Sequence, residues 1–143
     1  MRTVRVETRD LLFALENRVP GTTHYLDTET GEVIPAFSYN REKILADVQL
    51  HPNRFVRLAP QSGRDGFHVM EEFTRSVSRP EVRARLEAAL KGEHVFREFR
   101  AAVDEDPDER LRWQQFRSEA LIQHLRKRLE ALDVSMELVR GGD

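Results

Sequence analysis

The sequence predicts an α+β fold in which a small, mostly antiparallel sheet packs against four to five helices. Three observations predict it. A turn sequence, Thr28-Glu29-Thr30-Gly31, separates two short segments that read as strands. From residue 65 onward apolar residues recur with the 3.6-residue period of helices, and near the C-terminus apolar and polar residues alternate as in a strand. At 143 residues the chain has the length of one domain, so we expect a single domain over residues 1–143.

The predicted sheet begins with a hairpin over residues 24–37. Gly31 can adopt the positive φ of a bulged hairpin turn, and the Asp27 carboxylate can accept hydrogen bonds from the backbone N–H groups that follow it. Further strands are predicted over residues 54–58 and 134–139. The alternation near the N-terminus also permits a short strand there.

Helices are predicted from apolar stripes and from start signals. The strongest start signal is Asp106-Pro107-Asp108-Glu109, which combines a cap, a first-turn proline and two acids that favour the helix dipole. We expect this last helix to reach about Leu132. The earlier stripes are Leu11, Leu12 and Leu15; Ile44, Leu45 and Val48; Val69, Met70, Phe73 and Val77; Val82, Leu86, Ala89 and Leu90; and Val95, Phe96, Phe99, Ala102 and Val103.

The last helix has two apolar faces, whereas a surface helix needs one. One face comprises Leu111, Leu121, Ile122, Leu125, Leu129 and Leu132. Trp113, Phe116 and Ala120 lie on nearly the opposite side of the axis. Either this helix is sandwiched between the other helices and the sheet, or these three residues bind a partner, which is another protein or a second copy of the chain.

Composition excludes several classes of function. The formal net charge of −2 does not favour a general polyanion binder, although arginine (20 residues) far outnumbers lysine (3 residues). With no cysteine there is neither a disulfide nor a thiolate site. We see no secretory signal and no apolar run of membrane-spanning length, so we expect a soluble, cytoplasmic protein without a membrane partner.

Two local patterns are candidates for chemistry. His68 precedes Glu71 and Glu72 on a predicted helix, so a hydrolase using His68 with either glutamate is one hypothesis, and a solvated ion pair is the simpler interpretation. Gly63, Arg64 and Gly66 lie where a helix begins, and its free N–H groups would suit an anion.

No metal or cofactor is expected. The five histidines are scattered, and the acidic residues at 27–32 and 104–109 are better explained by turn formation and helix capping. Arginines brought together by the fold, such as Arg97, Arg100 and Arg117, would provide an alternative function in nucleic-acid binding.

Several segments, in this order and spacing, resemble a family of small bacterial proteins classified only as an uncharacterised protein family. They are LDTETGEV, RFVRLAP, HVMEEF, LKGEHVFREFR and WQQFRSEAL. The resemblance implies a bacterial α+β domain and carries over no activity or catalytic residue.

The leading hypothesis is therefore a non-catalytic cytosolic binding or regulatory domain with a protein partner. Whether the chain is an enzyme is left open by the sequence, which favours a non-catalytic role.

Overall fold

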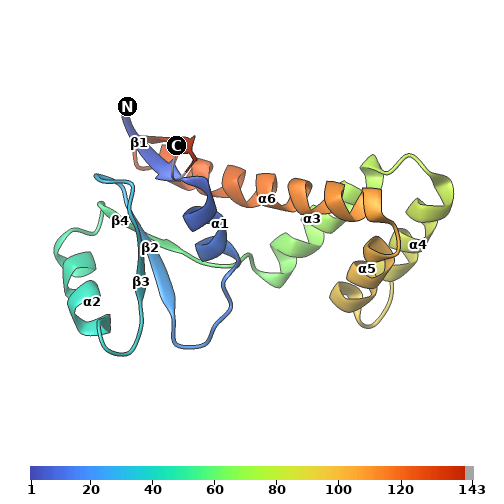
Figure 1. Cartoon of the computed structure of the whole chain (residues 1–143), viewed down its shortest axis with the longest axis horizontal. Coiled ribbons are helices and arrows are strands. Elements are labelled where there is room, and N and C mark those ends of the chain that lie inside the picture. The colour runs from blue at the N-terminus through green and yellow to red at the C-terminus, as the bar shows by residue number, and fades with distance from the viewer. Residues whose placement is uncertain (141–143) are drawn as a thin grey trace. The chain divides into compact units, whose positions relative to one another are not determined.

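The computed structural model describes residues 1–140 and has six helices and five strands in that range (Figure 1). The α+β prediction is confirmed, with more helices than the four or five expected. In chain order the elements are β1 (Arg2–Glu7), α1 (Thr8–Glu16), β2 (Thr23–Asp27), β3 (Val33–Ala36), α2 (Arg41–Leu50), β4 (Phe55–Leu58), α3 (Gly63–Ser76), α4 (Pro80–Leu90), α5 (Val95–Asp104), α6 (Pro107–Glu130) and β5 (Val134–Val139).

The chain folds into two compact units, each with its own hydrophobic core. The sheet unit contains residues 1–60 and the chain from Leu121 onward, and the helical unit contains residues 61–120. The single-domain prediction for residues 1–143 is not tested by this division and stays a prediction. Within residues 1–140 no helix combines the length and the apolar character that crossing a membrane would require.

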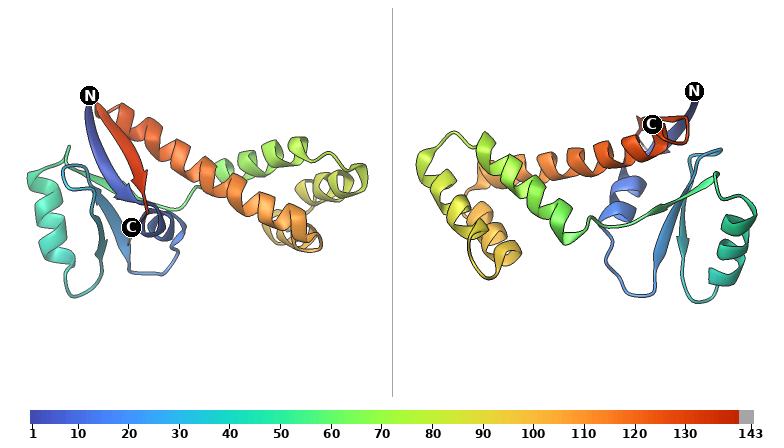
Figure 2. Two further views of the ribbon diagram at one scale, coloured as in Figure 1. Left: turned by 45° about the horizontal axis from the view of Figure 1, so that its top comes forward. Right: turned by 180° about the vertical axis from the view of Figure 1, so that it is seen from behind.

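The sheet unit holds two small sheets. One is three-stranded and antiparallel in the order β3–β2–β4, and it contains the predicted hairpin. The other pairs β1 with β5 in parallel, and the two strands run side by side in the left view of Figure 2. The last strand was expected in a mostly antiparallel sheet with the hairpin. It pairs instead with β1, because the N-terminal segment also forms a strand and lies beside it.

The hairpin turn forms as the sequence predicts. Asp27 Oδ1 accepts hydrogen bonds from the backbone N–H of Glu29 at 2.9 Å and of Thr30 at 3.4 Å. Gly31 has φ +81°, and a Cβ at this position would lie 1.9 Å from the carbonyl oxygen of Arg5. Glycine is therefore required both by the backbone conformation and by the close approach of β1.

Side chains donate hydrogen bonds to backbone carbonyl groups of strands at the edges of the sheets. Arg128 Nη2 donates to the carbonyl of Arg57 on β4 at 2.8 Å, and Arg126 Nη1 donates to the carbonyl of Met136 on β5. On β3, Pro35 has no N–H to offer. These features reduce the number of free backbone groups available for pairing with another strand.

The core of the sheet unit gathers residues from both sheets, α1 and the second half of α6. Leu121, Leu125 and Leu129 of α6 are all buried in it. The other buried members are Val4, Val6, Leu11, Ala14, Leu15, Leu26, Val56, Leu58, Val134 and Met136.

A separate core holds the helical unit together. Its buried members are Met70, Phe73, Val77, Val82, Leu86, Ala89, Phe99 and Val103. Trp113 packs between two aromatic rings, with its centroid 5.1 Å from that of Phe73 and 5.1 Å from that of Phe99. The Phe116 ring lies 5.5 Å from Phe73, so the first half of α6 belongs to this aromatic cluster.

These two cores explain the two apolar faces of α6. Its aromatic face packs in the helical unit, and its leucine face packs in the sheet unit one or more turns further along. Two residues assigned to the leucine face do not join a core: Leu111 is 59% exposed and Leu132 is 39% exposed.

Candidate functional site

Helix α5 presents the candidate surface because only one side of it is buried. Phe99 and Val103 point into the core of the helical unit and are 1% and 0% exposed. Phe96 was predicted to belong to the same apolar stripe, but half of its surface is exposed. It lies about 60° from Phe99 at 100° per residue, at the border of the buried side.

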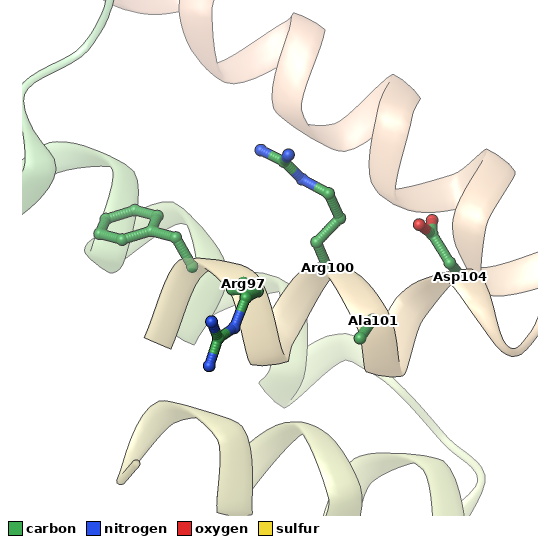
Figure 3. Close-up of a pocket in the computed structure, with 5 residues that line it drawn as sticks. Arg97, Arg100, Ala101 and Asp104 are labelled. Carbon is green, nitrogen blue, oxygen red and sulfur yellow. The ribbon is translucent and has the colours of Figure 1, made fainter. Parts of the chain in front are cut away.

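A shallow hollow of about 450 Å³ lies over the exposed side of α5. It is lined by Phe96, Arg97, Arg100, Ala101 and Asp104. The labelled side chains in Figure 3 leave the helix in different directions: Arg100 and Asp104 extend to one side of the axis and Arg97 to the other. The surface therefore combines an aromatic ring, two guanidinium groups, a carboxylate and a small apolar residue.

The predicted anion site lies next to this surface. Gly63, Arg64 and Gly66 are in the first turn of α3, and a Cβ on Gly66 would lie 3.4 Å from Phe96 Cε1. Ser62 caps the helix by accepting a hydrogen bond from the Asp65 N–H at 3.1 Å. This cap uses one of the free N–H groups, and the Asp65 carboxylate disfavours an anion. Anion binding here stays a prediction.

The structure places the candidate hydrolase residues on the exposed side of α3. His68 Nδ1 lies 3.2 Å from Glu71 Oε1, and the His68 side chain is 59% exposed. Glu72 is exposed, and none of the three residues lines the hollow over α5. This geometry is that of a solvated ion pair, and the hydrolase hypothesis gains no support from it.

The predicted partner-binding residues on α6 are all partly buried. Trp113 and Phe116 pack on the aromatic cluster, and Ala120 is half-buried beyond them. This packing uses much of each ring inside the helical unit. A role of their remaining surface in partner binding stays a prediction.

Of the three arginines proposed to form a patch, the fold places Arg97 and Arg100 over one hollow. Arg117 is half-buried on α6 and does not line it. Among residues 1–140, no group of three or more histidine or acidic side chains lies close enough together to hold a metal ion.

Comparison with known proteins identifies the family. The model of the uncharacterised protein family UPF0158 matches residues 1–138. The chain belongs to this family. A UPF0158 protein of Pseudomonas aeruginosa is 30% identical over 122 residues, which covers 85% of this chain and 78% of that protein. No solved structure matches the chain significantly. The resemblance seen in the sequence is thus confirmed, and neither the description of the UPF0158 family nor the name of this relative states an activity.

Sequence reasoning missed the exposed side of α5 in this UPF0158 chain as a single surface. A signal was present: positions 97, 100, 101 and 104 follow the spacing of one helix face, and that face is opposite the buried Phe99 and Val103. The composition of the segment did not indicate a surface, because the hydrophobicity of Phe96 predicts a core residue and the two arginines are typical of an ordinary solvated helix surface.

Proposed function

We propose that this protein is a non-catalytic binding domain, and that its partner is a protein that contacts the exposed side of α5. The half-exposed Phe96 beside Arg97 and Arg100 is the observation that carries the proposal. Aromatic residues and arginine are the residue types most enriched at the energetically important centres of protein interfaces. A shallow hollow next to them gives a partner side chain room to insert.

The two arginines are available for such a contact. Arg97 and Arg100 are exposed, and neither forms an ion pair within residues 1–140. Other arginines of the helical unit are engaged: Arg79 with Asp106, Arg85 with Glu105, and Arg112 with Glu109. A partner would thus gain two guanidinium contacts without breaking an intramolecular one.

Charge favours a protein over a nucleic acid. Asp104 lines the same hollow, and residues 61–120 contain 13 acidic and 11 basic side chains. A phosphate backbone would be repelled by this carboxylate and would find no continuous basic face. Nucleic-acid binding therefore remains the alternative.

Site-specific crosslinking tests the proposal, because the chain has no cysteine and a single one can be introduced. We would attach a photoactivated crosslinker to Ala101→Cys and, as a control, to the exposed position Arg110→Cys on α6. The proposal expects protein adducts from position 101 that disappear when Arg97 and Arg100 are both changed to Glu. Adducts that are destroyed by nuclease, or equal protein adducts from both positions, would contradict it.

A further inference from the structure

We propose that helix α2 (Arg41–Leu50) is a lid on the sheet unit: it lifts off the antiparallel sheet by local unfolding while the core of the unit stays packed. This opening uncovers the side chains of Tyr25 and Ala36, which are buried in the closed state. The proposal goes beyond the binding function, because α2 belongs to the sheet unit and α5 to the helical unit.

Helix α2 covers one face of the antiparallel sheet, and α1 lies on the other face (Figure 1). Strands β3 and β4 both run antiparallel to β2, so they run parallel to each other at opposite edges of the sheet. Helix α2 joins these two edges and therefore crosses over β2. Both views of Figure 2 show the same arrangement, with the sheet between the two helices. The side chains beneath α2 thus decide how firmly it is held.

The side chains beneath α2 form a layer that is separate from the two cores. Tyr25 and Ala36 are 8% and 2% exposed, and they belong to neither core. Tyr25 pairs with Ile34 and Thr23 pairs with Ala36 in the β2–β3 register, so these four side chains lie on the same face of the sheet. Leu26, the next residue along β2, points to the opposite face and joins the core of the sheet unit. Helix α2 therefore covers a thin layer of its own.

Helix α2 itself buries little apolar surface. None of its ten residues is buried, whereas three of the nine residues of α1 are. Among the apolar residues of α2, only Ile44 and Val48 are half-buried, and they lie one turn apart on the same side of the helix. Leu45 and Leu50 are exposed. Because stabilisation follows the apolar area removed from water, α2 is held on the sheet less strongly than α1.

Hydrogen bonds hold the ends of the α2 segment more firmly than its middle. Before the helix, Asn40 Nδ2 donates to a carbonyl of β3 at 3.0 Å, and after it Arg54 is fixed by two bonds to a buried carboxylate of β2. Within residues 1–140, one hydrogen bond joins an α2 side chain to another part of the unit, from Arg41 Nη2 to the Gly21 carbonyl at 2.7 Å. The two ends can therefore stay in place as hinges while the helix between them opens.

A single introduced cysteine reports the opening, because the chain contains none of its own. Ala36→Cys lies under α2, and the matched control Ala14→Cys lies at 1% exposure in the core of the sheet unit. We would measure how fast a water-soluble thiol reagent labels each full-length variant, relative to its rate in the urea-unfolded chain. Position 36 should react at least about 100-fold faster than position 14, since local opening is more frequent than global unfolding.

Two further changes separate local from global opening. Val6→Ala weakens the core of the sheet unit, so it should raise the rate at position 14 at least about tenfold and leave the rate at position 36 unchanged. Arg41→Ala removes the bond to Gly21 and should raise the rate at position 36 about threefold. Lys43→Ala removes the same charge from an exposed position of the same helix and should have no effect.

Three results would overturn the inference: equal relative rates at positions 36 and 14, a Val6→Ala change that accelerates both positions alike, or an Arg41→Ala change no different from Lys43→Ala. Fraying of α2 at its ends alone would give the first result, because Ala36 would stay covered. If circular dichroism shows that a cysteine variant does not fold, amide hydrogen exchange of the unchanged chain replaces it. The amides of α2 should then exchange with a weaker urea dependence than the protected amides of α1, and an equal dependence would contradict the lid.

Discussion

Arg54 binds the carboxylate of Asp27 through two parallel hydrogen bonds, from Nε to Oδ1 at 3.0 Å and from Nη2 to Oδ2 at 2.8 Å. Asp27 is 3% exposed, and it also holds the hairpin turn through its bonds to backbone N–H groups. The guanidinium group is the main reason that the pKa of Asp27 falls from 3.8 to about 2. The ionised form of Asp27 is therefore part of the folded state.

This pKa shift makes stability depend on acidity. Because the pKa is lower in the folded state, the stabilisation is complete above the unfolded value near 3.8 and is lost as the pH falls toward 2. The free energy of unfolding of the wild type should fall by about 2 kcal/mol more than that of Asp27→Asn over this interval. Urea titrations at several pH values would measure it. Glu29→Gln is the control: Glu29 is an exposed partner of Arg54, and its replacement should leave the acid dependence in place.

Gly31 should tolerate no side chain. Gly31→Ala forces alanine to φ +81° and places its Cβ 1.9 Å from the Arg5 carbonyl oxygen. We expect a loss of at least about 3 kcal/mol, from the strained backbone together with displacement of β1. Gly63→Ala provides the comparison, because nothing lies within 4 Å of a Cβ there and the residue is helical. That change should be neutral or slightly stabilising, and a similar loss at both positions in thermal unfolding would contradict the argument.

Replacing Trp113 by alanine should destabilise the helical unit, because its indole packs between Phe73 and Phe99. We expect a loss of about 3 kcal/mol, at the lower end of the range for aromatic truncation, since the residue is half-buried. Leu111→Ala on the same helix is 59% exposed and should cost less than about 0.5 kcal/mol. A Trp113→Ala variant that keeps its stability but loses association would instead favour the partner-binding role predicted from the sequence.

Arg128 should protect the edge strand β4 of the antiparallel sheet from pairing with a strand of another chain. Its guanidinium donates to the Arg57 carbonyl at 2.8 Å, so Arg128→Ala leaves a strand carbonyl without this partner. We expect a loss of about 1 kcal/mol and faster aggregation on heating. Its exposed neighbour Lys127 makes a suitable control for the lost charge. Light scattering would measure the aggregation of both variants. Equal aggregation of Lys127→Ala and Arg128→Ala would show that the loss of a positive charge alone explains the effect.

The sequence predicted best those features whose partners are close together in the chain. Asp27 and Gly31 define one turn, and every group needed to explain them lies within a few residues, apart from Arg54 and Arg5. The boundaries of β5 were also predicted correctly, because alternation over residues 134–139 is a local signal.

Long-range choices were not predictable in the same way. The pairing of β5 with β1 joins Arg2 to Val134 across almost the whole chain, and alternation does not reveal which strand is the neighbour. The two faces of α6 were recognised, but their division between two cores depends on where α3 and α5 pack. The surface on α5 was missed for the same reason: whether Phe96 is buried depends on the neighbouring helices, and its hydrophobicity alone suggested a core position.

His24 should keep its neutral form to a lower pH than an ordinary histidine. It is 5% exposed on the central strand, and burial lowers its pKa below 6.5. Asn17 accepts a hydrogen bond from the Val19 N–H through Oδ1, which turns its amide NH₂ toward His24 Nδ1 at 3.5 Å. Protonating Nδ1 would set two donors against each other. Because the unfolded chain binds the proton more readily, stability from this residue is complete above about pH 6.5 and falls as the pH drops below it. An NMR titration should show the midpoint of His24 below 6.5, the ordinary value for histidine. A midpoint at or above that value would show that burial does not control its charge.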